Sequence, residues 1–259
     1  SISDGTSVLY SGTVKASINI GYNHKILDIN ENLQKIIKAS KLTVKVNLKG
    51  TNYKNQWNIW VYPQKQTIDY GQVVYTRNLD EALKLLKSGK KVLLNPEWKK
   101  LKGIEGKFVP VFWSPIHFPK QAGTMGVLCN PSHSALADFP TDMNTDWQWW
   151  DLNVNSTTLI VDEIKGGNPI VEMVDNFANN RKLASLFEGS VNSGKLVIAS
   201  FDLNTDLEKR PVAKQMLISI LKYMNSSSFN PEAIKNPEVL KSILLEQKEK
   251  GKEGATSIY

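Results

Sequence analysis

The hydrophobic pattern changes its period near residue 65, and this change limits what the chain can fold into. Upstream of it, apolar and polar residues alternate over 42–48, which is the period-2 pattern of a half-buried strand. In the next segment Trp57, Ile59 and Val61 alternate again, and the intervening Trp60 and Tyr62 face the other way, so this strand is expected to be covered on both sides. Shorter runs over 7–10 and 15–20 fit strands of the same sheet. Short strands at this spacing predict a β-sandwich-like domain.

Downstream, strands and helices alternate. Val73–Tyr75 and Val92–Leu94 read as short buried strands, and the apolar face of a helix lies between them. Asn78 and Glu81 form a variant of the capping box that starts such a helix, and Gly89 is placed to end it. A strand, a helix and a strand within so few residues predict a parallel pairing.

Later segments continue this pattern. We expect a strand over 158–161, a hairpin that joins 183–191 to 195–201, and a long helix that starts near Pro211. The expected fold class is therefore α/β: a β-sandwich-like part followed by a domain with a largely parallel sheet. The predicted boundaries are 1–64 for the β part, 65–225 for the α/β domain and 226–259 for a peripheral tail with a mobile end.

Charge and composition exclude several classes of partner. The net charge of +7 and the pI of 9.2 admit nucleic acid, but the lysines are scattered and no pattern interleaves arginine with aromatic residues. A solvated surface is therefore favoured, without a nucleic-acid partner. No run approaches 18 apolar residues, so no membrane span is expected. The single Cys129 excludes an internal disulfide.

Catalytic residues are hard to find. Asn30-Glu31 resembles the dipeptide that carries the acid in barrel glycosidases, but no βα barrel surrounds it. Cys129 with His133 four residues later suggests a thiol nucleophile. Its flanks, Leu128 and Asn130-Pro131, do not suit a tight nucleophile elbow, so a buried structural cysteine is the favoured interpretation.

Metal and cofactor sites are not predicted. His24, His117 and His133 are far apart and lack the spacing of metal ligands. Gly166-Gly167 precedes Asn168-Pro169 and reads as a turn, not as a phosphate-binding loop.

Three tryptophans lie within residues 146–151, the most unusual segment of the chain. Trp147, Trp149 and Trp150 are candidates for a platform on which sugar rings stack. The candidate hydrogen-bonding partners for sugar hydroxyls are Asp146, Gln148 and Asp151. In the alternative interpretation, Trp147 and Trp149 point into the core and Trp150 covers a loop. Trp113, in a proline-rich loop, is open to the same two interpretations.

The order of several longer motifs resembles the C-terminal region of Bacteroidetes-type glycoside hydrolases of family 2, the β-galactosidase-like kind. The resemblance spans about residues 5–225, most of the chain. The matching segments are Asn55–Pro63, Phe112–Pro115, Thr124–Leu136, Phe139–Thr141, Asp146–Trp150, Gly194–Val197 and Arg210–Ala213.

The resemblance implies a fold and a role. In that family a β-sandwich is followed by a domain similar to class I glutamine amidotransferases, a flavodoxin-like arrangement. The catalytic carboxylates belong to an upstream barrel, so no residue here inherits them.

We therefore expect a non-catalytic accessory region of a secreted glycosidase, in the periplasm or outside the cell. It would pack on the barrel of the same polypeptide, shape the active-site rim or bring protomers together. The alternative is a carbohydrate-binding module. The start at Ser1, without a leader, favours a piece of a longer protein.

Overall fold

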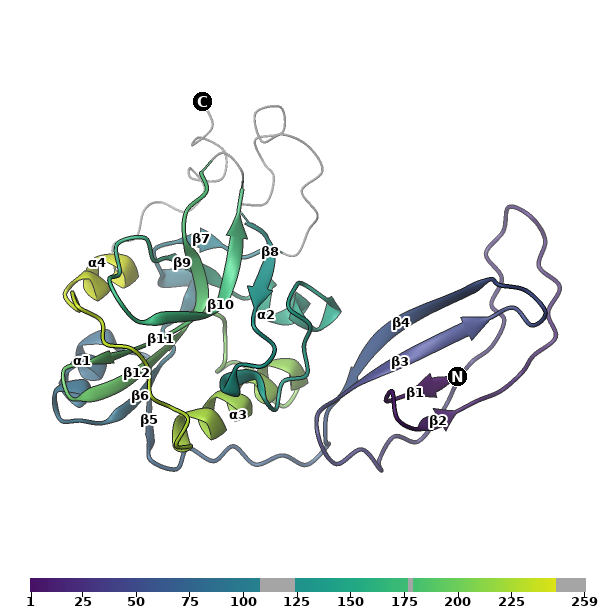
Figure 1. Ribbon diagram of the computed structural model, residues 1–259, viewed down its shortest axis with the longest axis horizontal. Helices are drawn as coiled ribbons and strands as arrows, with labels where there is room; N and C mark the ends of the chain where they lie inside the picture. Colours follow the sequence, from purple (N-terminus) through teal and green to yellow (C-terminus); the bar gives the residue numbers. More distant parts are fainter. Residues whose placement is uncertain (108–123, 177–178, 246–259) are drawn as a thin grey trace. The chain divides into compact units, whose positions relative to one another are not determined.

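The computed structural model describes residues 1–107, 124–176 and 179–245 (Figure 1). It divides into two compact units, Ser1–Gln66 and Thr67–Tyr259.

The first unit is a single four-stranded antiparallel sheet in the order β2-β1-β3-β4. Its strands are β1 Ile2–Ser3, β2 Val8–Tyr10, β3 Ser40–Asn47 and β4 Lys54–Val61. The long hairpin β3–β4 confirms the two alternating segments of the sequence. The run over 15–20 is not a strand, because residues 11–39 contain no regular element. The predicted sandwich is therefore one sheet without a second sheet in this unit.

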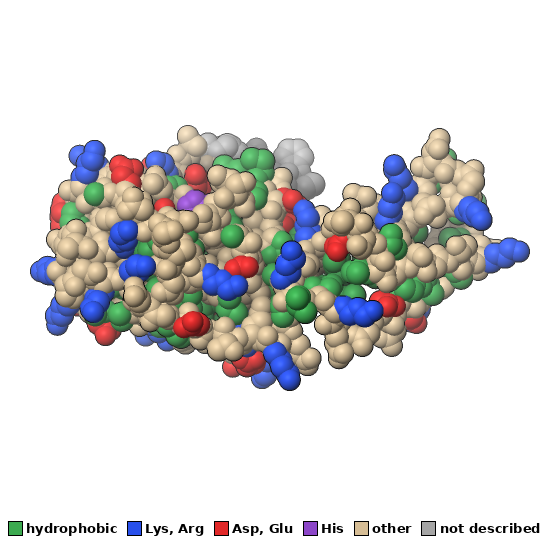
Figure 2. Space-filling view, turned by 60° about the horizontal axis from the view of Figure 1, so that its bottom comes forward, with side chains coloured by type: hydrophobic (Ala, Val, Ile, Leu, Met, Phe, Trp, Pro, Cys, Tyr) green, Lys and Arg blue, Asp and Glu red, His purple; other side chains and the backbone are tan. Residues whose placement is uncertain are grey.

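Cross-strand register gives this sheet one apolar face. Leu42 pairs with Ile59 and Val44 pairs with Trp57, and directly paired residues point to the same side of a sheet. Only Ile2 and Leu42 of the unit are buried hydrophobic residues. The rest of the apolar face is exposed in part, and Figure 2 shows hydrophobic side chains at the surface of this unit.

The second unit is a mixed α/β structure around one sheet whose main path is β5-β6-β12-β11-β10-β8. The main-path strands are β5 Val73–Thr76, β6 Lys91–Leu94, β8 Thr124–Cys129, β10 Asn168–Asp175, β11 Leu183–Val191 and β12 Gly194–Ala199. Two further strands, β7 Ile104–Glu105 and β9 Thr157–Ile160, pair with each other, and β9 also pairs with β11. The helices are α1 Leu79–Lys87, α2 Trp150–Val154, α3 Pro211–Asn225 and α4 Val239–Leu245.

The predicted strand–helix–strand unit is confirmed, but the largely parallel sheet is wrong. β5, β6 and β12 are parallel neighbours, while β11 is antiparallel to β12 and β10, and β10 is antiparallel to β8. A hairpin joins β11 to β12, and a short turn can only connect antiparallel strands. The turn needs Asn192 at a positive φ of 53°, and a Cβ on Gly194 would lie 2.7 Å from the backbone of Leu86.

Helices cover both faces of this sheet. The apolar side of α3 packs with Leu93 and Val197 on one face, whereas α1 and α4 pack with their neighbours in the same strands, Val92 and Leu196, on the other. Residues on both faces of the central strands are therefore buried, as in other three-layer α/β structures.

The predicted peripheral tail needs correction over residues 226–245. Phe229 is buried in the core cluster on the α3 side, and Leu240 and Leu244 of α4 are buried on the opposite side. Ser190 of β11 donates to the carbonyl of Pro231 at 2.8 Å. This segment thus completes the core. The predicted mobile end lies outside the described residues.

Candidate functional site

The tryptophan segment forms a capped, tight turn of helix. Asp146 precedes a 3₁₀ turn, Trp147–Trp149, and its Oδ1 accepts a hydrogen bond from the backbone N–H of Gln148 at 2.9 Å. α2 continues directly from this turn. Side chains three residues apart are eclipsed in a 3₁₀ helix, so Trp147 and Trp150 lie on the same side of the segment.

The structure separates the three tryptophans. Trp147 and Trp150 are 74% and 51% exposed, whereas Trp149 and Gln148 are buried. Trp149 packs edge to face on Phe139, with ring centroids 5.2 Å apart. Two indole rings, and not three, are therefore exposed at this segment. The alternative prediction is also wrong in part, because Trp147 does not enter the core.

The polar side chains that were expected to bind sugar hydroxyls form hydrogen bonds with other groups of the protein. The amide of Gln148 donates to the carbonyl of Pro140 at 3.1 Å, and Asp146 acts as the cap of the turn. Asp151 accepts hydrogen bonds from Arg210 Nε at 2.9 and 3.1 Å. These side chains fix the segment and do not reach toward a ligand.

Arg210 anchors this segment to the start of α3. Besides Asp151, its guanidinium lies 3.4 Å from Asp202 Oδ2 and donates to the carbonyl of Thr205 at 3.1 Å. Both carboxylates of this group are largely buried. Two exposed indoles thus stand on a base held by buried ion pairs, and a rigid base lowers the entropy cost of binding.

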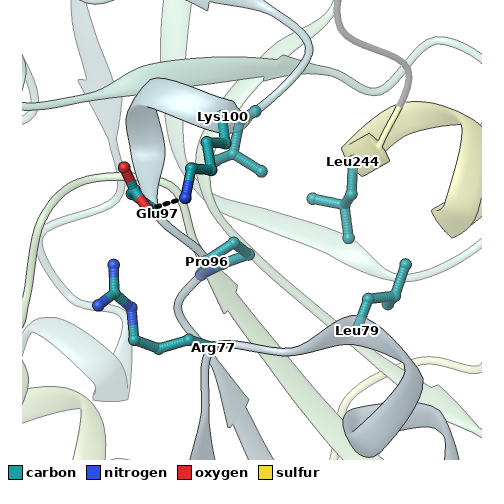
Figure 3. Close-up of a pocket in the computed structure, with 7 residues that line it drawn as sticks. Arg77, Leu79, Pro96, Glu97, Lys100 and Leu244 are labelled. Carbon is teal, nitrogen blue, oxygen red and sulfur yellow. Dashed lines mark ion pairs between the residues drawn. The ribbon is translucent and has the colours of Figure 1, made fainter.

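A second candidate site is a pocket of about 290 Å³ at the carboxyl ends of β5 and β6 (Figure 3). Arg77 follows β5, and Pro96 and Glu97 follow β6. Ligands of open α/β sheets commonly bind at this edge. In Figure 3, Leu79 and Leu244 line one side of the pocket, and the charged groups line the other.

Charge on the rim of this pocket is mainly positive. Glu97 forms a 2.7 Å ion pair with Lys100. This pairing, supported by the charges of Arg77 and Lys99, holds the pKa of Glu97 below its usual value. Glu97 therefore stays ionised near neutral pH and is unsuited to act as a general acid. The pocket suits a ligand with an apolar body and one anionic group.

Cys129 is a buried thiol. Its Sγ contacts the carbonyl oxygen of Asp142 at 3.4 Å. Burial raises its pKa to about 11, and the charges of Asp146 and Asp142 act in the same direction. The thiolate is the nucleophilic form, so this environment opposes the role of a nucleophile.

The two ring nitrogens of His133 lie close to groups other than the Cys129 thiol. Its Nδ1 accepts a hydrogen bond from the backbone N–H of Ala135 at 3.2 Å, and its Nε2 lies 3.7 Å from Glu188 Oε1. The Tyr223 hydroxyl donates to Glu188 Oε2 at 2.6 Å. Burial raises the pKa of Tyr223, and its bond to the Glu188 carboxylate adds to this. Sequence reasoning missed this buried group, since its members come from β11, α3 and the loop after β8.

The other predicted features bring no ligand set together. No cluster of metal-binding side chains is found among the described residues, and His117 and Trp113 lie outside them. Asn30-Glu31 is exposed in the irregular segment of the first unit. Glu31 lines two pockets there, of about 450 and 600 Å³, and among the described residues it is the only acidic one in either lining.

Two family models match this chain, and the boundary between the two structural units falls between the matched ranges. The family model described as domain of unknown function DUF8487 matches residues 74–245. The chain belongs to the DUF8487 family. A second model, domain of unknown function DUF8488, matches residues 1–63. No curated protein matches the sequence.

Both ends of the DUF8487 match lie in regular elements of the second unit. It begins within β5 and ends at the last residue of α4, so it includes residues 226–245 that complete the core. It contains both candidate sites, the exposed indole pair and the pocket. None of the helices among the described residues has the length and apolar character that crossing a bilayer requires.

Proposed function

We propose that this chain is a non-catalytic accessory region of a secreted, β-galactosidase-like glycoside hydrolase, and that Trp147 and Trp150 contact its glycan. The observation that carries the glycan contact is the pair of exposed indoles on a rigid base. Apolar sugar faces stack on such rings. The link to a glycosidase is supported by the ordered motifs of the sequence.

Several parts of this proposal concern the longer polypeptide. The catalytic carboxylates would lie in an upstream barrel, and the region would act in the periplasm or outside the cell. In this proposal, the region would pack on that barrel, shape the rim of its active site or join protomers. We also propose that the second unit has a fold similar to that of class I glutamine amidotransferases, a flavodoxin-like arrangement. The parallel trio β5-β6-β12 with α1 between β5 and β6 is compatible with it.

Chemistry of the described residues supports a non-catalytic role. Glycoside hydrolysis needs two carboxyl groups about 5–9.5 Å apart that face the bond to be cut. Arg210 holds the carboxylates of Asp151 and Asp202, and Arg181 holds that of Asp175 in a 2.9 Å ion pair. These groups serve the fold.

Titration with β-1,4-galacto-oligosaccharides, followed by isothermal calorimetry, tests the glycan contact. We expect binding that weakens about three- to tenfold for Trp147→Ala and for Trp150→Ala, because an aromatic stacking contact contributes about 0.5–1.5 kcal/mol. Trp57→Ala is the matched control, since Trp57 is an exposed tryptophan of the other unit. Equal affinity of all three variants and the parent chain would refute the assigned contact.

Activity of the chain alone tests the accessory role. With 4-nitrophenyl β-galactoside we expect no release above the buffer rate, and we expect turnover from a longer polypeptide that includes the upstream barrel. Turnover by the 259-residue chain itself would overturn the proposal.

A further inference from the structure

Charge is divided very unequally between the two units. Residues 1–66 contain nine lysines, no arginine and three acidic residues, and therefore carry +6 of the net charge of +7. The cause is a depletion of acidic residues, since this unit has 3 of the 25 in the chain. From Asn32 to Ile68 there are seven lysines and no acidic residue.

Cross-strand register gathers part of this charge on one face of the β3–β4 hairpin. Lys45 pairs with Gln56, and Asn47 pairs with Lys54; paired residues share a face. We call this surface the basic strand face, and its residues are Lys41, Thr43, Lys45, Asn47, Lys54, Gln56, Asn58 and Trp60. It is the side opposite to the apolar face that contains Leu42.

The basic strand face combines cations with neutral hydrogen-bonding groups. Lys45 and Lys54 are exposed. The Thr43 hydroxyl donates to Asn58 Oδ1 at 3.2 Å, so that amide keeps its two N–H donors for another acceptor. Lys45 lies opposite Gln56, and Lys54 lies opposite Asn47 in the next pair on the same face. The face therefore offers two exposed positive charges with amides beside them.

We infer that the basic strand face binds an anionic polysaccharide, a chain of uronate or similarly charged sugars. The inference rests on the proposed glycan-related function and names a substrate class for it. Lysine ammonium groups would pair with the sugar carboxylates, and the side chains of Gln56 and Asn58 would bond to hydroxyls. Complementary charge is the main attraction, since no acidic side chain lies on either strand of the hairpin.

Nucleic acid fits this surface less well. Proteins that bind single strands place successive exposed aromatic rings along a basic groove. Trp60 is the only aromatic residue of the basic strand face, and it is partly buried. Phosphate recognition also favours arginine, whose planar fork binds two oxygens, and this unit has none.

Affinity electrophoresis of the full chain tests the inference. The probes are sodium polygalacturonate, highly methyl-esterified pectin with the same sugar but few charges, poly-L-glutamate and poly(U). We expect retardation by polygalacturonate that decreases as salt is raised, with much weaker retardation by the other three. The double variant Lys45→Gln/Lys54→Gln should bind polygalacturonate at least about tenfold more weakly, because each lysine near an anionic surface contributes about a fivefold factor.

A matched control separates this face from the overall charge of the unit. Lys15→Gln/Lys35→Gln removes the same charge from exposed positions outside the strands and should leave binding within about twofold of the parent chain. Equal losses in the two double variants, or equal retardation by poly-L-glutamate or poly(U), would overturn the inference. Circular dichroism of each variant shows that the fold is kept. The tryptophan variants tested with neutral galacto-oligosaccharides probe the proposed function separately, so either can fail alone.

Discussion

The two units of this chain solve the problem of forming a core in different ways. The unit of residues 67–259 buries both faces of its sheet under α3 on one side and α1 with α4 on the other. The unit of residues 1–66 buries only Ile2 and Leu42 among its hydrophobic residues. A unit of 66 residues buries a smaller fraction of its surface than a longer one. In addition, the single sheet of this unit is covered by no second layer of strands or helices within the unit.

Under the two proposals, this difference suits the units to separate tasks. A large core fixes side chains within tenths of an ångström and suits sites that need rigid positions, such as the indole pair and the pocket. A thin sheet presents broad, exposed faces of contrasting character, one apolar and one basic. Four substitutions test whether the contrast in burial corresponds to a contrast in stability.

The largest effect is expected in the core of the second unit. Trp149→Ala removes a buried indole that packs on Phe139 and donates to Thr141 Oγ1 at 2.9 Å. We expect the free energy of unfolding of this unit to fall by about 3–5 kcal/mol. Trp147→Ala, two residues away and exposed, should change it by less than about 0.5 kcal/mol. Urea denaturation followed by circular dichroism measures both, and similar losses would contradict the assigned burial.

A slightly smaller loss should be enough to unfold the first unit. Leu42→Ala empties the centre of its only sheet, at a cost of about 2–5 kcal/mol. Hydrogen exchange read by mass spectrometry should then show lost protection over 40–61 and unchanged protection over 183–199. Val46→Ala, on the exposed part of the same face, is the control. Protection that survives in Leu42→Ala would mean that the core of the first unit extends beyond Ile2 and Leu42.

Removal of one hydroxyl group from each unit compares a buried hydrogen bond with an exposed position. Tyr223→Phe deprives the buried Glu188 carboxylate of its hydroxyl donor, and we expect a loss of about 1–3 kcal/mol. Tyr53→Phe, at an exposed position of the first unit, should leave stability within about 0.5 kcal/mol. Thermal unfolding of both variants provides the measurement. An unchanged transition in Tyr223→Phe would show that Glu188 has another donor.

The smallest effect concerns acid stability. Burial acts to raise the pKa of Asp202, but hydrogen bonds from the Asn204 and Thr205 backbone and the charge of Arg210 outweigh it, so the pKa is lowered. A lowered folded pKa stabilises the protein above the unfolded value of about 3.9 and ceases to do so as the pH falls through the folded value. Asp202→Asn should therefore reduce stability at pH 7 and flatten its decline below about pH 4. Urea midpoints from pH 2 to 7 test this, and parallel profiles would contradict it.

Local patterns were sufficient to predict much of this fold. The capped helix after Asn78 is confirmed by the hydrogen bond from the Glu81 N–H to Asn78 Oδ1 at 3.0 Å, and the long helix after Arg210 is confirmed as α3. These signals lie within a few residues of one another, so neighbouring side chains determine them. The hairpin β11–β12 was predicted for the same reason.

Features that depend on distant partners were not predicted. Residues 15–20 alternate as a strand does, but no edge of the sheet in this unit pairs with them. Exposure of Trp147 and burial of Trp149 depend on Phe139 and Thr141, which no periodicity in the tryptophan segment encodes. The pocket joins residues after two strands to Leu244 of α4, and the segment that contains Leu244 was interpreted as a tail.

The position of β12 between a parallel and an antiparallel neighbour has a consequence for how the chain folds and how it tolerates insertions. β12 meets β11 through a tight hairpin, but its partner on the other side is far away in sequence, with Lys195 opposite Lys91. Closure of so long a loop makes this pairing a late and slow event in folding. Its entropy cost grows only logarithmically, by about 0.6 kcal/mol for each doubling of length. Sequence added between β6 and β11, where the indole pair lies, should therefore cost the sheet little, and surface recognition can diversify there while the strands keep their order.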